Sequence, residues 1–303
     1  MKKFFSILCM CLLVLSGCGS ENSTSGETRT ISDVRGEVSI PTSPKRVVDL
    51  SGNSDMLALL GFNVVGTANS DAYDQTKLPS YLDGYLSDAK ILGYNMNADV
   101  SIEEIINLNP DLIIISTIQD ASYEQLSQVA PTVEIQLEQI DWKKDFITLG
   151  SMLGKEEVAT EWLKNYEELA KTKGQAIKDT HGDQTYLTLL ASGGQLFVLQ
   201  EAGIGGVMYN DMGLKRPENM PEQTGIELPV ISYEGLSEIN PDYLMVVATD
   251  SDKQALEANS VYQNMEAVKN DKGTILNSSP YFNQGYSVVG RELFVNEVGD
   301  LIK

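Results

Sequence analysis

Side chains that hold transition metals directly are almost absent from this sequence. Histidine occurs once among 303 residues, at His181, and all three cysteines lie within the first 18 positions. A directly bound zinc or manganese ion needs a cluster of histidine, cysteine or carboxylate ligands. The sequence therefore predicts no metal held directly by the protein, and we expect His181 in a solvated turn. Haem held through tyrosine or methionine stays open as an alternative.

Positive charge and catalytic motifs are also scarce. Lysine and arginine total 22 against 43 aspartates and glutamates, which gives a formal net charge of -21. Such a chain repels nucleic acid and anionic lipid surfaces, so neither is an expected partner of the folded part.

No P-loop, G-x-S-x-G or other catalytic motif occurs, and a Ser-His-Asp triad would have to use His181. We therefore do not expect an enzyme.

The apolar run at the amino terminus, residues 4–15, is too short to cross a bilayer as a stable helix. It follows two lysines and ends in Leu-Ser-Gly-Cys at 15–18, so residues 1–17 have the layout of a signal peptide. The last four residues resemble the lipobox of bacterial lipoproteins, whose cysteine becomes the lipidated first residue. We expect lipidation at Cys18, followed by a flexible tether to residue 28. A secreted protein with an incidental cysteine is the alternative.

The middle of the chain carries one long helical pattern. Between residues 155 and 180, apolar side chains recur at spacings of three and four, which is one stripe of a helix. They are Val158, Ala159, Trp162, Leu163, Tyr166, Leu169, Ala170 and Ile177. At about 1.5 Å per residue, such a helix would span roughly 37 Å, longer than one sheet needs. The pattern predicts a rigid strut between two lobes; an ordinary surface helix, or a helical hairpin broken at Gly174, is the alternative.

Two similar units flank this helix. Ser-Ile-Glu-Glu-Ile-Ile-Asn-Leu-Asn-Pro-Asp at 101–111 is matched by Ser-Tyr-Glu-Gly-Leu-Ser-Glu-Ile-Asn-Pro-Asp at 232–242, and an apolar run follows each. Each unit predicts a short helix, a stop at Asn-Pro-Asp and a buried strand. We therefore expect an α/β fold of two lobes, each with a central, mostly parallel sheet flanked by helices, joined by one long inter-lobe helix. Because ligands bind beyond the carboxyl ends of such strands, a cleft is expected between the lobes.

These patterns also set the expected boundaries. Residues 29–141 form the predicted N-terminal lobe, 142–180 the linking helices and 181–303 the C-terminal lobe. In the first lobe, Ser122 and Gln125 have the spacing of a capping box, which predicts a helix that begins at Tyr123. In the second lobe, Ser-Gly-Gly at 192–194 predicts a hairpin between two strands.

Six segments, in order along the chain, resemble the iron-siderophore substrate-binding lipoproteins of ABC importers, which have the class III periplasmic-binding-protein fold. They are PTSPKRVV at 41–48, LGFNVVG at 60–66, NPDLII at 109–114, LSQVAPTV at 126–133, LGSMLGK at 149–155 and VKN at 268–270. The resemblance implies two lobes with little hinge motion, a ferric siderophore in the cleft and delivery to an ABC transporter permease dimer. It implies that iron(III) is carried as a siderophore chelate, with no cofactor bound directly. It further implies a monomer, held only by its lipid anchor at the outer face of the cell membrane of a Gram-positive bacterium.

The siderophore subclass depends on smaller differences. The Ala-Pro-Thr-Val segment at 130–133 favours the hydroxamate branch of that family. Hydroxamate binders often carry a Gly-Arg-Gly-Gly loop after the second-lobe hairpin, whereas this chain has Gly-Ile-Gly-Gly at 203–206, with Ile204 in place of the arginine. Alternatives therefore stay open: a receptor of the same fold for haem, cobalamin or a ferric catecholate, or a surface lipoprotein that binds a protein or acts as an enzyme.

The loops expected to face the cleft carry aromatic and amide side chains and few basic ones. The candidate ligand-binding residues are Asn53, Tyr73, Tyr94, Asn95, Thr117, Arg216, Tyr281 and Phe282. A ferric trihydroxamate is a bulky chelate of low charge with an apolar periphery, which suits aromatic faces and a few hydrogen-bond donors. A trianionic ferric catecholate would favour several cations, and few lie in these loops. As a set these residues favour a hydroxamate, although any one aromatic is more often a packing residue.

The repeated unit also places Glu103 and Glu234 at equivalent positions on the two lobes. A glutamate in the first turn is stabilised by the helix dipole, which is one reason to find it there. Ser101 and Glu104 form a capping box, yet the counterpart of Glu104 is Gly235, so helix-start stabilisation is not kept in both copies. In the resembling family, a glutamate at this place on each lobe binds arginines of the two permease subunits. The resemblance thus implies permease docking through Glu103 and Glu234, with helix stabilisation as the alternative.

Overall fold

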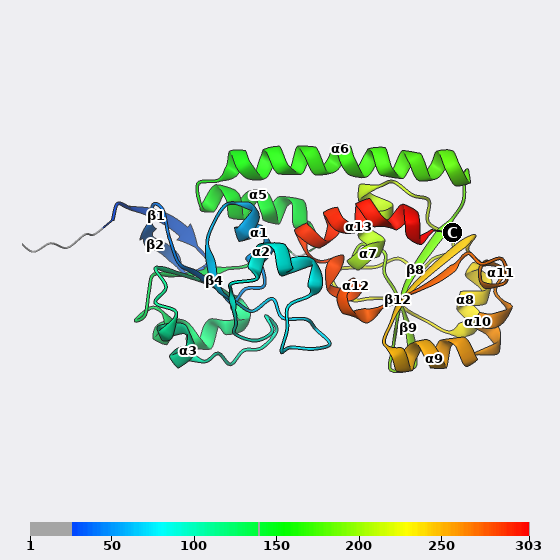
Figure 1. Ribbon diagram of the computed structural model, residues 1–303, viewed down its shortest axis with the longest axis horizontal. Coiled ribbons are helices and arrows are strands. Elements are labelled where there is room, and N and C mark those ends of the chain that lie inside the picture. The colour runs from blue at the N-terminus through cyan, green and yellow to red at the C-terminus, as the bar shows by residue number, and fades with distance from the viewer. Residues whose placement is uncertain (1–25, 139, 303) are drawn as a thin grey trace, which may run out of the picture.

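The computed structural model describes residues 26–138 and 140–302, so the predicted signal peptide, Cys18 and most of the tether lie outside the described residues. Two lobes lie side by side, and one helix, α6 (Glu156–His181), runs along both of them (Figure 1). Within the described residues, no helix has both the length and the apolar content that a membrane span requires. The predicted two-lobed α/β fold is confirmed.

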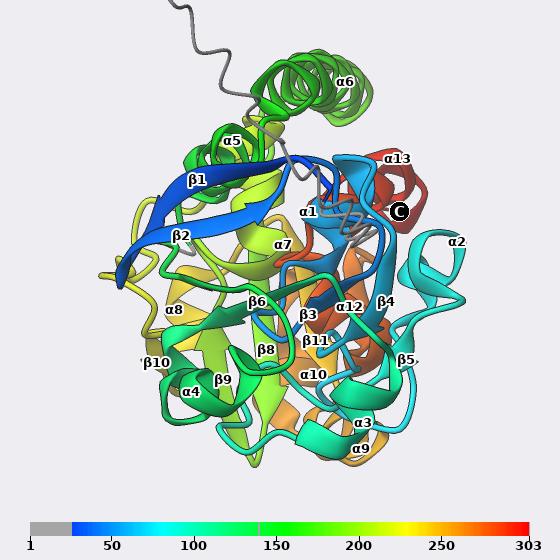
Figure 2. The same ribbon diagram turned by 90° about the vertical axis from the view of Figure 1, so that its left-hand side faces the viewer.

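The N-terminal lobe has a five-stranded parallel sheet in the order β5-β4-β3-β6-β7. Its strands are β3 (Val47–Asp49), β4 (Val64–Thr67), β5 (Lys90–Ile91), β6 (Leu112–Ser116) and β7 (Thr132–Ile135). Its helical segments are α1 (Ser54–Leu59), η1 (Ser80–Leu82), α2 (Asp83–Leu86), α3 (Ile102–Asn107), η2 (Thr117–Ser122) and α4 (Tyr123–Leu126). An antiparallel hairpin of β1 (Thr28–Asp33) and β2 (Gly36–Pro41) forms a separate sheet beside it (Figure 2).

The C-terminal lobe has a mixed sheet in the order β10-β9-β8-β11-β12. Its strands are β8 (Tyr186–Ser192), β9 (Gln195–Val198), β10 (Val230–Ile231), β11 (Tyr243–Ala248) and β12 (Gly273–Asn277). Its helical segments are α7 (Gly203–Gly206), η3 (Val207–Asp211), α8 (Tyr233–Ile239), α9 (Asp250–Ala258), α10 (Ser260–Asn264), α11 (Glu266–Lys269), α12 (Ser278–Gln284) and α13 (Val288–Leu301). Strands β8, β11 and β12 are parallel, and β8 pairs antiparallel with β9, which confirms the predicted hairpin.

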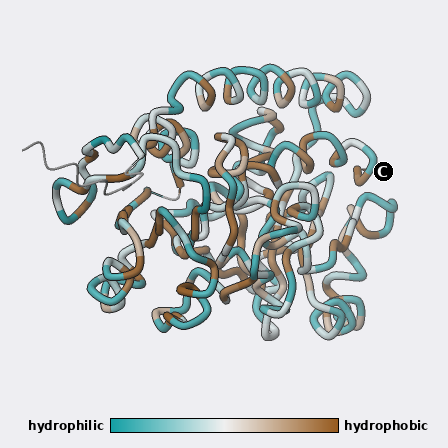
Figure 3. The backbone as a smooth tube through the Cα atoms, turned by 60° about the vertical axis from the view of Figure 1, so that its left-hand side comes forward, coloured by the Kyte–Doolittle hydropathy of each residue, from teal (hydrophilic) through white to brown (hydrophobic). Residues whose placement is uncertain are grey.

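One hydrophobic cluster extends through both lobes and along the inner face of α6. Figure 3 shows the apolar segments gathered inside the lobes, whereas the turns of α6 are largely hydrophilic. A second cluster fills the other face of the N-terminal sheet, between β3, β6 and α3. Because buried apolar contacts are lost when packed elements separate, the shared cluster opposes large movements of one lobe against the other.

Helix α6 is uninterrupted over 26 residues, so the alternative of a hairpin broken at Gly174 is wrong. A Cβ atom at Gly174 would lie 2.0 Å from the carbonyl oxygen of Met212, so the missing side chain lets the helix rest directly on the C-terminal lobe. On the other lobe α6 packs on α5 (Trp142–Met152), where the rings of Trp142 and Trp162 meet edge to face. The glycine is therefore a packing residue inside the predicted strut.

The two copies of the repeated unit have the same local structure. The hydroxyl of Ser101 caps α3 and that of Ser232 caps α8, each accepting a hydrogen bond from the backbone N–H three residues ahead. After each helix an asparagine takes a left-handed conformation, with φ of 47° at Asn109 and 42° at Asn240. Asparagine tolerates this region better than most residues, which explains its place before the proline.

The aspartate that ends each unit ties its strand to the neighbouring one. The carboxylate of Asp111 accepts hydrogen bonds from the backbone N–H groups of Lys45 and Arg46, at 2.7 and 2.9 Å. Asp242 accepts bonds from the N–H and hydroxyl of Thr185, both at 2.8 Å. In each lobe the bonded residues lead into the strand next to the one that the aspartate begins. The Asn-Pro-Asp sequence is thus a joint between adjacent parallel strands.

Candidate functional site

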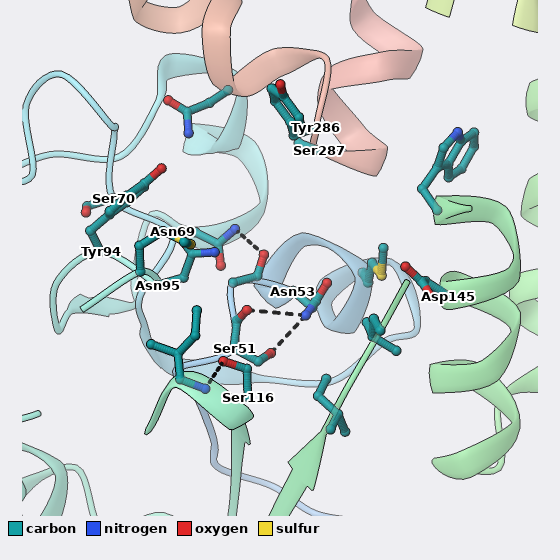
Figure 4. A pocket seen from close by; sticks show the side chains of 18 of the residues that line it. Ser51, Asn53, Asn69, Ser70, Tyr94, Asn95, Ser116, Asp145, Tyr286 and Ser287 are labelled. Carbon is teal, nitrogen blue, oxygen red and sulfur yellow. Dashed lines mark hydrogen bonds between the residues drawn. The ribbon is translucent and has the colours of Figure 1, made fainter. Parts of the chain in front are cut away.

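A cavity of about 360 Å³ opens between the lobes at the carboxyl ends of the N-terminal strands. Ser51 and Asn53 follow β3, Asn69 follows β4 and Thr117 follows β6. Tyr286, just before α13, closes the cavity from the C-terminal lobe; Figure 4 shows it facing Asn53 and Asn69 across the space. This is the place where an open parallel sheet binds ligands, as the sequence predicts.

The structure brings five of the eight candidate ligand-binding residues together around this cavity. They are Asn53, Tyr94, Asn95, Thr117 and Phe282. Asn53, Tyr94 and Asn95 come from loops after strands of the N-terminal lobe, and Thr117 begins η2 directly after β6. Phe282 comes from α12 of the other lobe. Residues chosen from two separate halves of the sequence therefore meet at one site.

The other three candidates lie outside the cavity wall. Tyr73 meets Phe282 edge to face, with ring centroids 5.6 Å apart, and so supports the site from behind. Tyr281 turns towards Phe294 of α13, with centroids 6.4 Å apart. Arg216 is exposed and lies 3.9 Å from the carboxylate of Glu201. Ile204, which stands in place of the family's arginine, is fully buried in the core.

Sequence reasoning missed several residues of the wall. Asn69 follows β4 as Asn53 follows β3, so the same strand-end argument would have identified it. Trp142 and Tyr286 gave no such signal, because they reach the cavity only through the packing of α5 and α13 against the N-terminal lobe. Tyr81 comes from the long polar stretch between β4 and β5.

A buried carboxylate shapes the loop that carries Asn53. Asp49, at the end of β3, accepts hydrogen bonds from the hydroxyls of Ser51 and Ser54, at 2.5 and 2.6 Å, and from the backbone N–H of Asn53 at 3.0 Å. Burial raises the pKa of Asp49, although the hydrogen bonds oppose that shift. Asn69 adds a bond of 2.8 Å from its amide to the carbonyl of Gly52. The polar rim is therefore ordered before a ligand arrives.

A buried amide holds the loop of Tyr94 and Asn95. The side-chain N–H group of Gln119 donates to the carbonyls of Asn95 and Asn97, both at 2.9 Å, while its oxygen accepts from the backbone N–H of Ser116. The capping box predicted at Ser122 and Gln125 is wrong, because Ser116 and Gln119 form it instead. Gln125 is exposed, whereas the buried Gln119 can satisfy two loop carbonyls at once.

The tyrosines of the wall are neutral hydrogen-bonding groups. Burial raises the pKa of Tyr286 to about 12 and raises the pKa of Tyr81 well above its usual value. Burial, aided by the charge of Asp71, also raises the pKa of Tyr94. At neutral pH these phenols keep their protons, and a metal ion is bound by the deprotonated form. They can therefore donate hydrogen bonds to a ligand in the cavity.

Direct metal binding finds no support elsewhere in the described part of the chain. No group of three or more histidine, cysteine, aspartate or glutamate side chains within it has the arrangement to hold a metal ion. His181 is the last residue of α6 and its Nδ1 lies 2.9 Å from the Tyr243 hydroxyl, so the expectation of a solvated turn is wrong. The ring instead packs edge to face on that tyrosine.

The two glutamates of the repeat are exposed in the first turns of α3 and α8. The backbone N–H of Glu234 itself and the hydroxyl of Ser232 lower the pKa of Glu234, so part of its role is at the helix start. Glu104, beside Glu103, lies 3.6 Å from Lys90. Both Glu103 and Glu234 are accessible to a partner.

The model of the Periplasmic binding protein family matches residues 49–279. The iron(3+)-hydroxamate-binding protein FhuD of Bacillus subtilis is 30% identical over 97% of this chain and 95% of its own. The petrobactin-binding protein YclQ of the same organism is 27% identical over 99% of both chains. A solved structure, the periplasmic binding protein component of a Fep/Fec-like ferrichrome ABC transporter from Bacillus subtilis, is similar with a TM-score of 0.73. It is 26% identical, and the match covers 89% of this chain and 98% of that one.

Proposed function

This chain belongs to the periplasmic binding protein family, and on that basis we propose that it captures a ferric siderophore and delivers it to an ABC importer. The observation that carries the proposal is the cavity between the lobes, whose wall combines aromatic rings with neutral amides and hydroxyls. Its volume lies in the range of small-molecule sites. A binding protein needs such a wall and no reactive group, which agrees with the missing catalytic motifs.

We further propose a hydroxamate as the chelating group. Three hydroxamate anions balance the charge of iron(III), so the chelate centre is neutral and its periphery is largely apolar. The rings of Tyr94, Tyr286 and Phe282 suit that periphery, and the amides of Asn53 and Asn95 can donate to the chelating oxygens. A trianionic ferric catecholate would require cations, and none of the described residues that line the cavity is lysine, arginine or histidine.

We propose that Glu103 and Glu234 dock the protein on the permease dimer. Both glutamates are exposed, and each lies two residues after the serine that caps the equivalent helix of its lobe. Each of two similar permease subunits can therefore bind one of the two carboxylates through the same surface. The protein is expected to act as a monomer, with Cys18 as its lipid anchor at the outer face of a Gram-positive cell membrane. Cys18→Ala should release it from the membrane or leave its precursor uncleaved; unchanged processing and retention would contradict the anchor.

Tryptophan fluorescence tests the ligand directly. The sequence has two tryptophans; Trp142 lines the cavity and Trp162 packs against it, with ring centroids 6.5 Å apart. Titration of the purified protein with ferric hydroxamates should quench this emission in a saturable way, and the iron-free hydroxamates should bind much more weakly. Haem, cobalamin and a ferric catecholate belong in the same panel. Saturable binding of one of these, with no hydroxamate bound, would reject the ligand class; binding of none would reject the function.

A further inference from the structure

Asn283 lies where the two lobes meet beside the cavity. It belongs to α12, which begins directly after β12 of the C-terminal lobe, and it lines the cavity next to Phe282. Its Oδ1 accepts a hydrogen bond of 3.1 Å from the backbone N–H of Ala72, in the loop after β4 of the N-terminal lobe. One side chain of the cavity wall is therefore held by the backbone of the opposite lobe.

Two further contacts join this loop to α12. The hydroxyl of Ser279 donates a hydrogen bond of 2.6 Å to the fully buried carboxylate of Asp71, and the rings of Tyr73 and Phe282 meet edge to face. The same carboxylate accepts a bond of 2.8 Å from the backbone N–H of Tyr73, so the loop is itself ordered. These contacts set the position of Asn283 before a ligand arrives.

The bond from Ala72 also determines which end of the Asn283 amide faces the cavity. A backbone N–H can only donate, so the atom opposite it must be the amide oxygen; the reverse orientation would place two donors against each other. Ala72 lies outside the cavity wall, so Nδ2 is the end that is left for the cavity. Within the described residues, Nδ2 of Asn283 makes no hydrogen bond, and it is not a buried group. The wall therefore carries an oriented donor without a protein partner.

Asn69, on the N-terminal side of the cavity, is used differently. Its Oδ1 accepts a hydrogen bond of 3.2 Å from the backbone N–H of Ser54, and its Nδ2 donates one of 2.8 Å to the carbonyl of Gly52. Both ends of that amide therefore order the loop after β3. Of these two asparagines in the wall, Asn283 is the one whose whole NH2 group is left for a ligand.

We propose that Asn283 is a ligand-binding residue that determines specificity, because its NH2 group donates hydrogen bonds to the metal-bound oxygens of a ferric chelate. The inference rests on the proposed siderophore-binding function. Each hydroxamate holds iron(III) through oxygens that share its negative charge and keep lone pairs for further bonds. Hydrogen bonds to charged acceptors are stronger than those between neutral groups. Asn283 is thus matched to the centre of the chelate, whereas the aromatic rings of the wall suit its periphery.

Two substitutions at Asn283 separate a ligand contact from a contact between the lobes. Asn283→Asp keeps an oxygen for the N–H of Ala72 but removes the donor and turns a second oxygen towards the chelate. Asn283→Ala removes the oxygen and the donor together. A ligand contact predicts that both variants bind more weakly than the wild-type protein, with the aspartate variant the weaker of the two by affinity and reduced at least about tenfold. A contact between the lobes alone predicts wild-type affinity in Asn283→Asp and a loss only in Asn283→Ala.

The probes are two uncharged ferric trihydroxamates, the cyclic ferrichrome and the linear ferric N-acetyl-desferrioxamine B, titrated by the tryptophan fluorescence described above. Because neither carries a net charge, a charge added away from the cavity should change their affinity little. Asn277→Asp is the matched control, since it makes the same substitution at the exposed residue just before α12, outside the cavity wall. It should leave the affinity within about twofold.

Wild-type affinity in Asn283→Asp would overturn the donor role, and so would an equal loss of affinity in Asn277→Asp. If neither hydroxamate binds but ferric citrate or a ferric catecholate does, the hydroxamate assignment fails. The same variants then decide with that chelate, whose iron is also held by anionic oxygens. If the wild-type protein binds a ferric chelate and Asn283→Asp binds it equally well, this inference alone fails. If no ferric chelate binds the wild-type protein, the proposed function fails and this inference fails with it.

Discussion

The carboxylate of Asp55 in α1 of the N-terminal lobe accepts a hydrogen bond of 2.7 Å from the hydroxyl of Ser287, which caps α13 of the other lobe. The same oxygen accepts a bond of 2.7 Å from the backbone N–H of Val288. Asp55 is 2% exposed, so one buried acid satisfies the start of a helix that belongs to the opposite lobe. This contact and the shared hydrophobic cluster agree with the small hinge motion that the family resemblance implies.

Asp55→Ala should destabilise the protein by about 2–4 kcal/mol, because it leaves buried donors at the start of α13 without an acceptor. Urea unfolding followed by circular dichroism measures the change. Asp83→Ala is the control, since Asp83 is an exposed acid in the first turn of α2 and should cost less than about 0.5 kcal/mol. Equal effects of the two substitutions would contradict the role of Asp55 as an inter-lobe contact.

Gly174→Ala should destabilise the protein by about 2–4 kcal/mol, because the new methyl group would meet the Met212 carbonyl oxygen and push α6 off the C-terminal lobe. Gly299→Ala, in α13, is the matched control. A Cβ atom there meets nothing within 4 Å, so this change should stabilise the helix by about 0.5–1 kcal/mol. Thermal unfolding of both variants tests this prediction. An unchanged melting temperature for Gly174→Ala would mean that α6 is not in close contact with the C-terminal lobe at this position.

Alkaline pH should weaken the fold through buried tyrosines. Burial raises the pKa of Tyr209 to about 12, while an unfolded tyrosine loses its proton near pH 10. The folded state therefore holds more protons between these values, and its stability falls as the pH rises through this window. Tyr209 alone accounts for about 2–3 kcal/mol of that fall. Below pH 10 the stabilisation of the folded state by Tyr209 is fully present.

Tyr209→Phe should therefore show a smaller loss of stability between pH 10 and 12 than the wild-type protein, each measured against its own value at pH 8. Tyr85→Phe is the control, because Tyr85 is 44% exposed. Tyr85→Phe should leave most of the loss of stability at alkaline pH unchanged. Parallel curves for all three proteins would mean that Tyr209 does not hold its proton in the folded state.

Tyr94→Ala should weaken binding of the ferric hydroxamate by about 1–3 kcal/mol, because it removes an aromatic face from the cavity wall. Arg216→Ala should leave the affinity within about twofold, because Arg216 lies beside Glu201 outside the wall. The fluorescence titration described above measures both. The reverse order would mean that Arg216 reaches the ligand after a rearrangement of its loop.

Replacing Glu103 and Glu234 together by alanine should leave siderophore affinity intact and abolish iron uptake in cells, because exposed charges mainly determine partner recognition. Glu124→Ala with Glu257→Ala is the control; it removes two exposed helix acids, one from each lobe, outside the repeated unit. This control pair should import normally. Normal uptake by the first pair would leave only helix stabilisation as the role of these glutamates.

Several features of this protein could be predicted from short segments of its sequence. The stripe of apolar residues in α6 follows from helix geometry, and the Asn-Pro-Asp joints at Asn109 and Asn240 follow from the conformations those residues tolerate. The strand-end rule located Asn53 and Thr117 at the cavity because both follow parallel strands directly. In each case the physical cause acts between residues close together in the chain.

Other features depend on contacts between distant segments, which the sequence does not display. Gln119 and not Gln125 forms a capping box, because Gln119 is buried against the loop that contains Asn95 and Asn97. The path of the loop after the hairpin places Arg216 beside Glu201 and outside the cavity wall. Asp145 has the sequence pattern of an ordinary acid in the first turn of a helix, and only the packing of α5 beside the N-terminal sheet places its side chain in the cavity wall. Short-range patterns were therefore enough to predict the two lobes and the strut, whereas the make-up of the cavity wall depends on which side chains the two lobes bring together in the folded protein.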